Sequence, residues 1–168
     1  MTRFFVLLAV IAACAYPAGA TADSPYDYVT GGGWVVPWNA HADAHFAFTA
    51  HNGTSGVTGR MQLRFTYDEG TPDEQYSAEV ICLTVVGNEA TLSGVITRVV
   101  NPTSGLQEGD QLTFQVTDNG QPGSLVPDEF AEHSGGQPCP SLGGGQFVTQ
   151  GNINVNQGDP LWVPIWLF

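Results

Sequence analysis

Three of the four histidines in this chain lie within an eleven-residue stretch that also carries a carboxylate. On an extended strand, His41, Asp43 and His45 fall on one face, because successive side chains alternate. Two imidazoles and a carboxylate are ligands that Zn²⁺ and other transition metals accept. The spacing therefore predicts a metal site, and exposed histidines at the entry to a strand are the alternative.

A second group of candidate ligands surrounds turns later in the chain. Asp118 and Asn119 precede a glycine, and Asp128 follows nine residues after Asn119. Side-chain oxygens around turns are typical of extracellular Ca²⁺ sites, although the spacing of an EF-hand is absent. Asp-Asn-Gly is also a favourable turn sequence, because such side chains bond to nearby backbone groups. A Ca²⁺ site and a plain turn both stay open.

The motifs of common enzymes are absent from the sequence, which has no Gly-x-Ser-x-Gly elbow, phosphate-binding glycine loop or His-Glu-x-x-His pair. Cys82 lies in an apolar run, a poor setting for a thiolate nucleophile. We therefore predict a protein without catalytic activity. Trp34, Trp38 and Tyr67 have the ring type that stacks on sugars, so a small carbohydrate- or metal-binding protein is the alternative.

The first twenty residues predict export. Arg3 is followed by an apolar run, Pro17 and the small residues of 18–20, which is the order of a cleaved signal peptide. Cleavage after Ala20 or Ala22 would release the protein. Cys14 follows Ile11-Ala12-Ala13, and this pattern would instead make Cys14 the lipidated first residue of an anchored protein. The apolar run is too short for a membrane-spanning helix.

The charge of the chain excludes one class of partner. Four Lys and Arg residues face 16 Asp and Glu residues, for a net charge of -12. Such a surface has little with which to neutralise phosphates, so nucleic acid is a poor partner. The expected partner is an extracellular or envelope protein or glycan.

Two cysteines remain beyond the signal, Cys82 and Cys139. In an oxidising compartment an even pair is usually bridged, so we predict a disulfide between them. Two buried free thiols are the alternative.

The pattern of the remaining chain predicts a single all-β domain. Alternation of apolar and polar residues at 60–67, 112–117 and 147–156 is typical of half-solvated strands, and Gly87-Asn88 is a hairpin signal between two more apolar runs. Further strands are expected near 29–37 and 44–50, with a long irregular connection at 119–145. Seven or eight antiparallel strands indicate a β-barrel or β-sandwich.

These features divide the chain into four parts. They are a signal peptide at 1–20, a linker at 21–27, the all-β domain at 28–156 and an apolar tail at 157–168. The tail ends in Leu161–Phe168, which is too short to cross a bilayer as a helix and contains Pro164. Packing over one end of the domain, docking to a partner and insertion at a membrane interface are the alternatives for this tail.

Several stretches of the domain together resemble the post-COAP domain, a small module of exported bacterial proteins. They are Val29–Trp34, Phe46–Phe48, the hairpin from Cys82 to Gly94, Val116–Pro122 and Gly151–Val155. The resemblance covers roughly residues 28–156 and implies an exported all-β module of undetermined function. It supplies no catalytic or ligand-binding residue. We therefore expect a non-catalytic interaction module of the cell surface or extracellular space.

Overall fold

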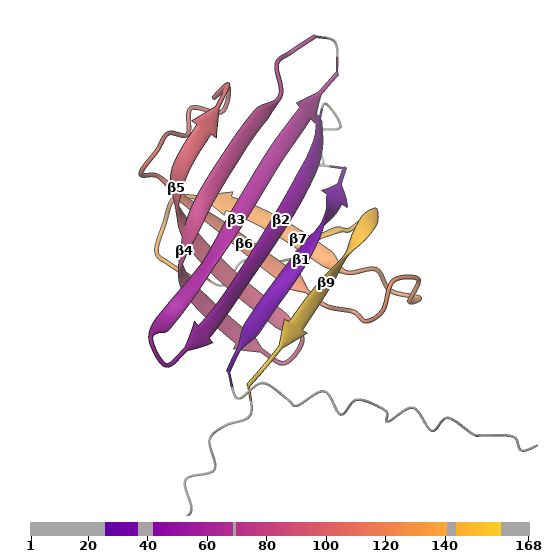
Figure 1. Ribbon diagram of the computed structural model, residues 1–168. Helices are drawn as coiled ribbons and strands as arrows, with labels where there is room; N and C mark the ends of the chain where they lie inside the picture. Colours follow the sequence, from indigo (N-terminus) through magenta and orange to yellow (C-terminus); the bar gives the residue numbers. More distant parts are fainter. Residues whose placement is uncertain (1–25, 37–41, 69, 141–143, 159–168) are drawn as a thin grey trace, which may run out of the picture.

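Nine antiparallel β-strands make up the fold (Figure 1). The computed structural model describes residues 26–36, 42–68, 70–140 and 144–158, and within these ranges it contains no helix. The strands are β1 (Tyr28–Val35), β2 (Ala42–Gly53), β3 (Gly56–Tyr67), β4 (Glu74–Val86), β5 (Glu89–Val100), β6 (Gln111–Thr117), β7 (Glu129–Ser134), β8 (Gln146–Phe147) and β9 (Gln150–Asn156). The prediction of an antiparallel all-β protein is confirmed.

All nine strands belong to one sheet, which curls into a half-barrel. Its strand order is β8-β7-β6-β5-β4-β3-β2-β1-β9. The first and last strands of this order are consecutive in the chain, separated only by Val148 and Thr149. The segment from β8 to β9 therefore passes from one edge of the sheet to the other. In Figure 1, β1, β2, β3 and β9 lie in front, and β6 and β7 cross behind them.

The alternation in β2 shows how the sequence sets the two faces of the sheet. From Ala42 to Ala50, every second residue is buried and the residues between them are exposed. The partner strand β3 buries Met61 and Leu63, and their neighbours point outward. One concave face therefore receives the apolar residues, as the period of two requires.

The long strands β4 and β5 bend through irregularities in their pairing. The register between them shifts at Ser77/Ala78 and again at Val80/Cys82. After the second shift the buried positions of β4 change from even to odd numbers, with Val80 and then Leu83 buried. A β-bulge of this kind increases local twist and lets a sheet turn. Val80 and Leu83 therefore both face the core although three positions separate them.

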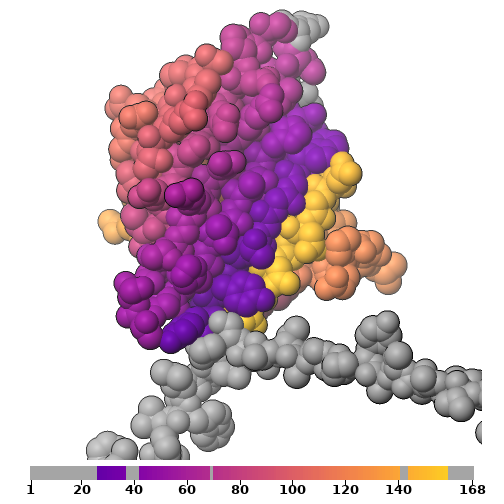
Figure 2. Space-filling model, viewed as in Figure 1, coloured from indigo at the N-terminus to yellow at the C-terminus, as the bar shows by residue number. Residues whose placement is uncertain are grey.

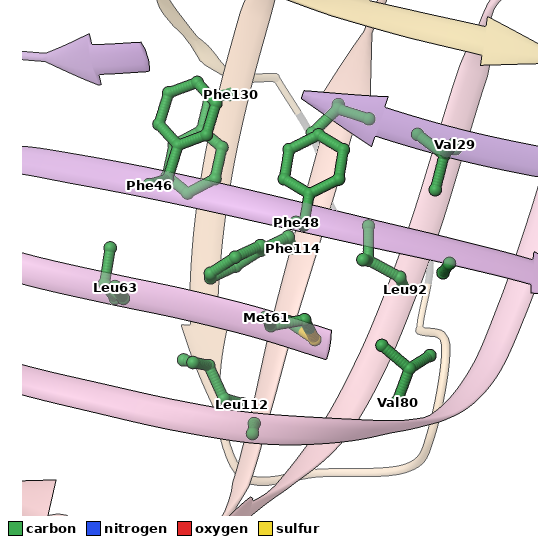
Figure 3. Close-up of a cluster of buried hydrophobic side chains, with 14 of the residues drawn as sticks. Val29, Phe46, Phe48, Met61, Leu63, Val80, Leu92, Leu112, Phe114 and Phe130 are labelled. Carbon is green, nitrogen blue, oxygen red and sulfur yellow. The ribbon is translucent and has the colours of Figure 1, made fainter. Parts of the chain in front are cut away.

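Four phenylalanine rings fill the centre of the half-barrel (Figure 3). Phe46 of β2 stacks on Phe130 of β7 with ring centroids 4.1 Å apart, and Phe114 meets Phe130 edge-on at 4.9 Å. Phe48 contacts Phe114 from the opposite layer at 6.1 Å. Aromatic contacts thus join the front strands to the back strands, and side chains fill the interior between them.

A disulfide links Cys82 of β4 to Cys139 in the connection between β7 and β8, with 5.9 Å between the Cα atoms. The backbone N–H of Cys139 also donates a hydrogen bond to the Ser93 hydroxyl at 2.7 Å. Ser93 and Thr113 share a second hydroxyl bond, and both side chains are fully buried. The loop therefore covers polar residues on the outer face of the sheet, and the predicted cysteine pairing is confirmed.

Two details of the predicted strands are wrong. The connection at 119–145, expected to be irregular, contains β7, and β7 pairs with β6 over six residues. The last strand is divided into β8 and β9, which brings the number of strands to nine. The signal at 1–20, Cys14 and the tail residues Leu161–Phe168 lie outside the described residues. Nowhere in the described ranges is there a helix that could span a membrane.

Candidate functional site

The acidic turn residues Asp118 and Asp128 lie at opposite ends of the β6–β7 connection, and both bond to β9. Asp128 accepts hydrogen bonds from the backbone N–H of Ile153 at 2.8 Å and of Asn119 at 2.9 Å. Asp118 accepts the N–H of Val155 at 3.0 Å and of Gly120 at 2.9 Å. Each of the four carboxylate oxygens thus accepts a hydrogen bond from a backbone N–H.

These two residues, here called the carboxylate bridge, tie the outer edge of β9 to the back layer. β9 pairs with β1 along one edge, and the bridge satisfies N–H groups on the other. Figure 2 shows the β6–β7 connection projecting beside β9. Asn119 completes the turn by donating from its amide nitrogen to the carbonyl of Pro127 at 2.8 Å. This geometry favours the turn interpretation of the predicted Ca²⁺ ligands.

Calcium is accordingly expected to have little effect on this protein. Because each carboxylate oxygen of Asp118 and Asp128 already accepts a backbone N–H, Ca²⁺ would have to compete with these donors for the same oxygens. We expect millimolar CaCl₂ to raise the melting temperature by less than about 1 °C, since only a ligand that binds the folded state stabilises it. Thermal melts with CaCl₂ and with EGTA would measure this. A larger rise that is absent in Asp118→Asn would contradict the prediction.

The predicted transition-metal site is described only in part. Asp43 and His45 both lie on the exposed face of β2, two residues apart, as the alternation predicts. The His45 ring stacks against Trp34 of β1 at a centroid distance of 6.3 Å. His41 lies outside the described residues, and within them no three His, Cys, Asp or Glu side chains come together. A Zn²⁺ site at His41, Asp43 and His45 stays a prediction.

Of the aromatic residues considered for sugar stacking, the two that the structure describes, Trp34 and Tyr67, do not form one platform. Trp34 donates from its indole nitrogen to Gln150 at 3.3 Å and lies beside His45 on the outer face. Tyr67 lies opposite the buried Ala42 and directs its hydroxyl to Glu74. Trp38 lies outside the described residues.

A buried carboxylate that the sequence did not single out lies at the start of β4. Glu74 is fully buried. Its oxygens accept the backbone N–H groups of Thr103 at 2.7 Å and Ser104 at 2.9 Å, together with the Thr103 hydroxyl at 3.0 Å. The hydroxyls of Tyr67, at 3.0 Å, and of Tyr76 complete the set. We call these five residues the Glu74 cluster.

The Glu74 cluster keeps its carboxylate ionised. Burial alone would raise the pKa of Glu74, but the hydrogen bonds from Ser104, Tyr76 and Thr103 outweigh it and lower the pKa to about 2. Burial, followed by the bond to Glu74, raises the pKa of Tyr76 to about 12. The cluster therefore holds one charge and a protonated tyrosine. It anchors the β5–β6 connection to β4, which is a structural role.

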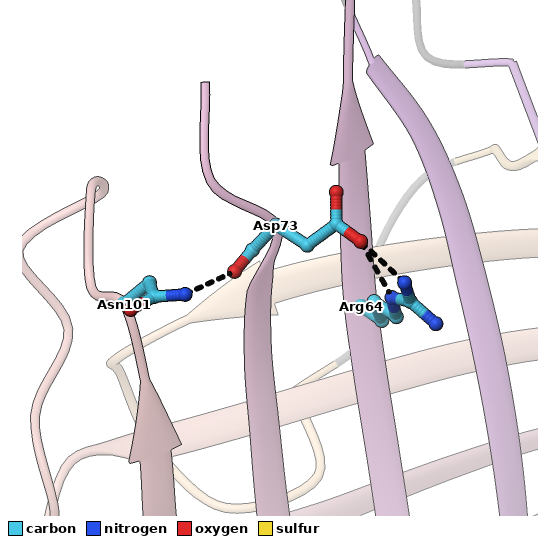
Figure 4. A network of polar contacts seen from close by, with 3 residues as sticks. All are labelled: Arg64, Asp73 and Asn101. Atoms are coloured by element: carbon cyan, nitrogen blue, oxygen red, sulfur yellow. Dashed lines mark hydrogen bonds and ion pairs between the residues drawn. The ribbon is translucent and has the colours of Figure 1, made fainter. Parts of the chain in front are cut away.

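The neighbouring ion pair contrasts with this buried cluster (Figure 4). Arg64 donates to one Asp73 oxygen from two nitrogens, of which Nε lies at 3.1 Å. Asn101 donates to the Asp73 carbonyl, also at 3.1 Å. The Arg64 side chain is 56% exposed and that of Asp73 is 34% exposed, so water screens the charges.

Replacement of Arg64 with glutamine is therefore expected to change stability little. Exposed ion pairs typically contribute between 0 and about 1 kcal/mol, so we expect the free energy of unfolding to fall by less than about 1 kcal/mol. Urea unfolding of Arg64→Gln and wild type would measure the difference. A loss of several kcal/mol would mean that the pair is coupled to the Glu74 cluster behind it.

Glu132 differs from the other carboxylates. It lies opposite Phe114 in the β6–β7 ladder and two residues beyond Phe130, so it belongs to the concave row of that strand. Desolvation by the surrounding protein raises the pKa of Glu132, although the residue keeps an exposed surface. A carboxyl group of raised pKa can donate protons, but this single group does not define a reaction.

The hollows along the described residues lie at the surface of the half-barrel. One of ≈ 320 Å³ lies beside the carboxylate bridge and is lined by the β6–β7 connection and the start of β9, including Ser124 and Gln150. A second of ≈ 540 Å³ lies where β3 and β4 separate, next to Val57 and Val80.

Comparison with known proteins found no matching family model, no matching curated protein and no matching solved structure. The fold and the geometry above are therefore the basis for inferring function. The resemblance to the post-COAP domain stays a prediction.

Proposed function

We propose that this protein is an exported, non-catalytic β-domain that binds a protein or glycan of the cell surface or extracellular space through its outer surface. The observation that carries the proposal is the filled interior. Phe46, Phe114 and Phe130 pack against one another where a ligand-binding barrel would hold its ligand. The predicted signal peptide, the acidic composition and the disulfide support an oxidising, extracytoplasmic setting.

The hydrogen bonds that the acidic side chains accept within the protein also support the proposal. The carboxylates of Glu74, Asp118 and Asp128 are held by backbone donors and perform structural work. The alternative function is that of a small extracytoplasmic protein that binds a carbohydrate or a metal in a pocket. The hollow beside the carboxylate bridge favours a small polar ligand, because hydroxyl and amide side chains line it.

Two measurements on the secreted product test this proposal. The first is intact mass spectrometry after expression of the full chain in a bacterium. A product that begins near residue 21, or an acylated product that begins at Cys14, supports export, and an uncleaved cytoplasmic chain contradicts it.

The second measurement is binding to a panel of immobilised polysaccharides and extracellular matrix proteins, with Glu132→Gln as the matched variant. Binding that is equal in both proteins supports the proposal. Turnover of a glycan that Glu132→Gln abolishes would show an enzyme instead.

A further inference from the structure

The sheet is incomplete where β3 and β4 separate. β3 pairs with β4 only from Arg60 to Phe65, and beyond Glu79 the strand β4 pairs with β5 alone. Gly56–Gly59 therefore pairs with β2 along one edge, and the structure records no ladder along the other edge. We call this edge, with the ≈ 540 Å³ hollow beside Val57 and Val80, the β3 notch.

The β3 notch has the properties of a site for strand addition. Along a free antiparallel edge, alternate residues present their N–H and C=O groups outward, and another strand can pair with them. Val57 is partly buried against the core and Val80 is buried, so the inner wall of the notch is apolar. An extended apolar segment would thus gain both hydrogen bonds and burial here.

The described chain ends close to this notch. The backbone N–H of Gly158 donates to the Asp27 carboxylate at 2.9 Å, and Asp27 in turn accepts the N–H of Asn52, near the end of β2, at 2.9 Å. The Gln157 side chain accepts the N–H of Gly87 in the β4–β5 turn at 2.9 Å. The exit of the chain is therefore held between the β2–β3 and β4–β5 hairpins, at the end of the half-barrel where the notch opens.

We propose that the C-terminal segment Leu161–Phe168 adds as a strand to the free edge of Gly56–Gly59 in the β3 notch of the same chain. Ten residues follow Gly158. The last four residues of the segment, 165–168, match the length of the free edge Gly56–Gly59. Residues 159–164 then span the distance from Gly158 and reach about 20 Å at about 3.3 Å per extended residue, which is enough to pass the ends of β1, β2 and β3 at about 4.8 Å between neighbouring strands.

The sequence of the segment fits an edge strand. Leu161, Val163, Ile165 and Leu167 alternate with Trp162, Pro164, Trp166 and Phe168. The aliphatic row would face Val57 and Val80. The aromatic row would lie over the polar rim of the hollow, which includes His51, Arg60 and Glu79. Proline is accepted at the start of a strand, so Pro164 fits immediately before the four paired residues. This inference goes beyond the proposed function and does not depend on it.

The test uses the chain from residue 21 to Gly158 and a synthetic peptide of residues 159–168. We expect saturable one-to-one binding in calorimetry, absent for a scrambled peptide of the same composition. Val57→Glu, which places a charge on the notch wall, should weaken binding by at least about tenfold, an effect that calorimetry resolves easily. Val99→Glu is the matched control, because Val99 is a partly buried valine elsewhere in the sheet. Equal binding by the scrambled peptide, or equal loss in both variants, would overturn the proposal.

Hydrogen exchange keeps the proposal testable if Val57→Glu does not fold. The amides of Val57 and Gly59 should exchange slowly in the full chain and at least about tenfold faster in the chain that ends at Gly158. Unchanged exchange rates would overturn the proposal. A full chain that is dimeric, and becomes monomeric on truncation, would also overturn it, because the segment would then dock on a second copy.

Discussion

Replacement of Glu74 with alanine is expected to destabilise the protein by about 4 kcal/mol, because several buried donors lose their acceptor at once. The N–H groups of Thr103 and Ser104 and the Tyr76 hydroxyl all donate to this carboxylate. The methyl group of alanine accepts none of these hydrogen bonds. Urea unfolding followed by tryptophan fluorescence would measure the change in the free energy of unfolding.

Glu74→Gln is the matched control for size. Its amide oxygen can still accept the N–H groups of Thr103 and Ser104, and its NH₂ group then faces the hydroxyls of Tyr67 and Thr103. The negative charge is lost, so the destabilisation should be smaller than in alanine yet still clear. If both variants unfold at the wild-type urea concentration, the Glu74 cluster is not a stabilising anchor.

The same cluster predicts how stability depends on pH. The pKa of Glu74 is about 2 in the folded protein and 4.5 when unperturbed, so the carboxylate form favours folding. Its contribution is complete above pH 4.5 and is lost as the pH falls from 4.5 towards 2. Converting the difference in pKa gives about 3 kcal/mol. Melts between pH 7 and pH 2 should therefore fall more steeply for wild type than for Glu74→Gln. Parallel curves would contradict this prediction.

The elements that sequence reasoning found are those set by local pattern. The alternation of β2 and β3 follows from side-chain period alone, and Gly87 takes the positive φ of 62° that a two-residue hairpin requires. The pairing of Cys82 with Cys139 followed from their number. In each case, neighbouring residues or simple counting carried the information.

The elements that sequence reasoning missed depend on distant contacts. β7 carries one buried aromatic residue, Phe130, and becomes a strand because β6 offers it a free edge. Glu74 lies in an acidic stretch that looks solvated, and its burial depends on Thr103 and Ser104, about thirty residues later. Asp118 and Asp128 both bond to β9, a role that depends on a strand about thirty residues away, and the Ca²⁺ site stays a prediction.

Replacement of Asp128 with alanine is expected to destabilise the protein by about 3 kcal/mol and to loosen β9. The buried Asp128 carboxylate accepts the N–H of Ile153, a core residue that is 1% exposed, and the N–H of Asn119. Each buried donor left without a partner costs about 1–3 kcal/mol. Hydrogen exchange would locate the effect, because the Ile153 amide should lose protection before the amides of β2 and β3 do.

Asp118→Ala is the matched control within the same bridge. Asp118 is less buried than Asp128 and bonds to Val155, which is only partly buried, so its loss should cost less, about 1 kcal/mol. If Asp128 acts by tying β9 to the back layer, the two variants should both speed exchange in β9 and differ in degree. If instead Asp128→Ala lowers stability while exchange in β9 stays as slow as in wild type, the carboxylate acts through the turn at Asn119 alone. The sheet edge would then be held by β1 and by the packing of Ile153.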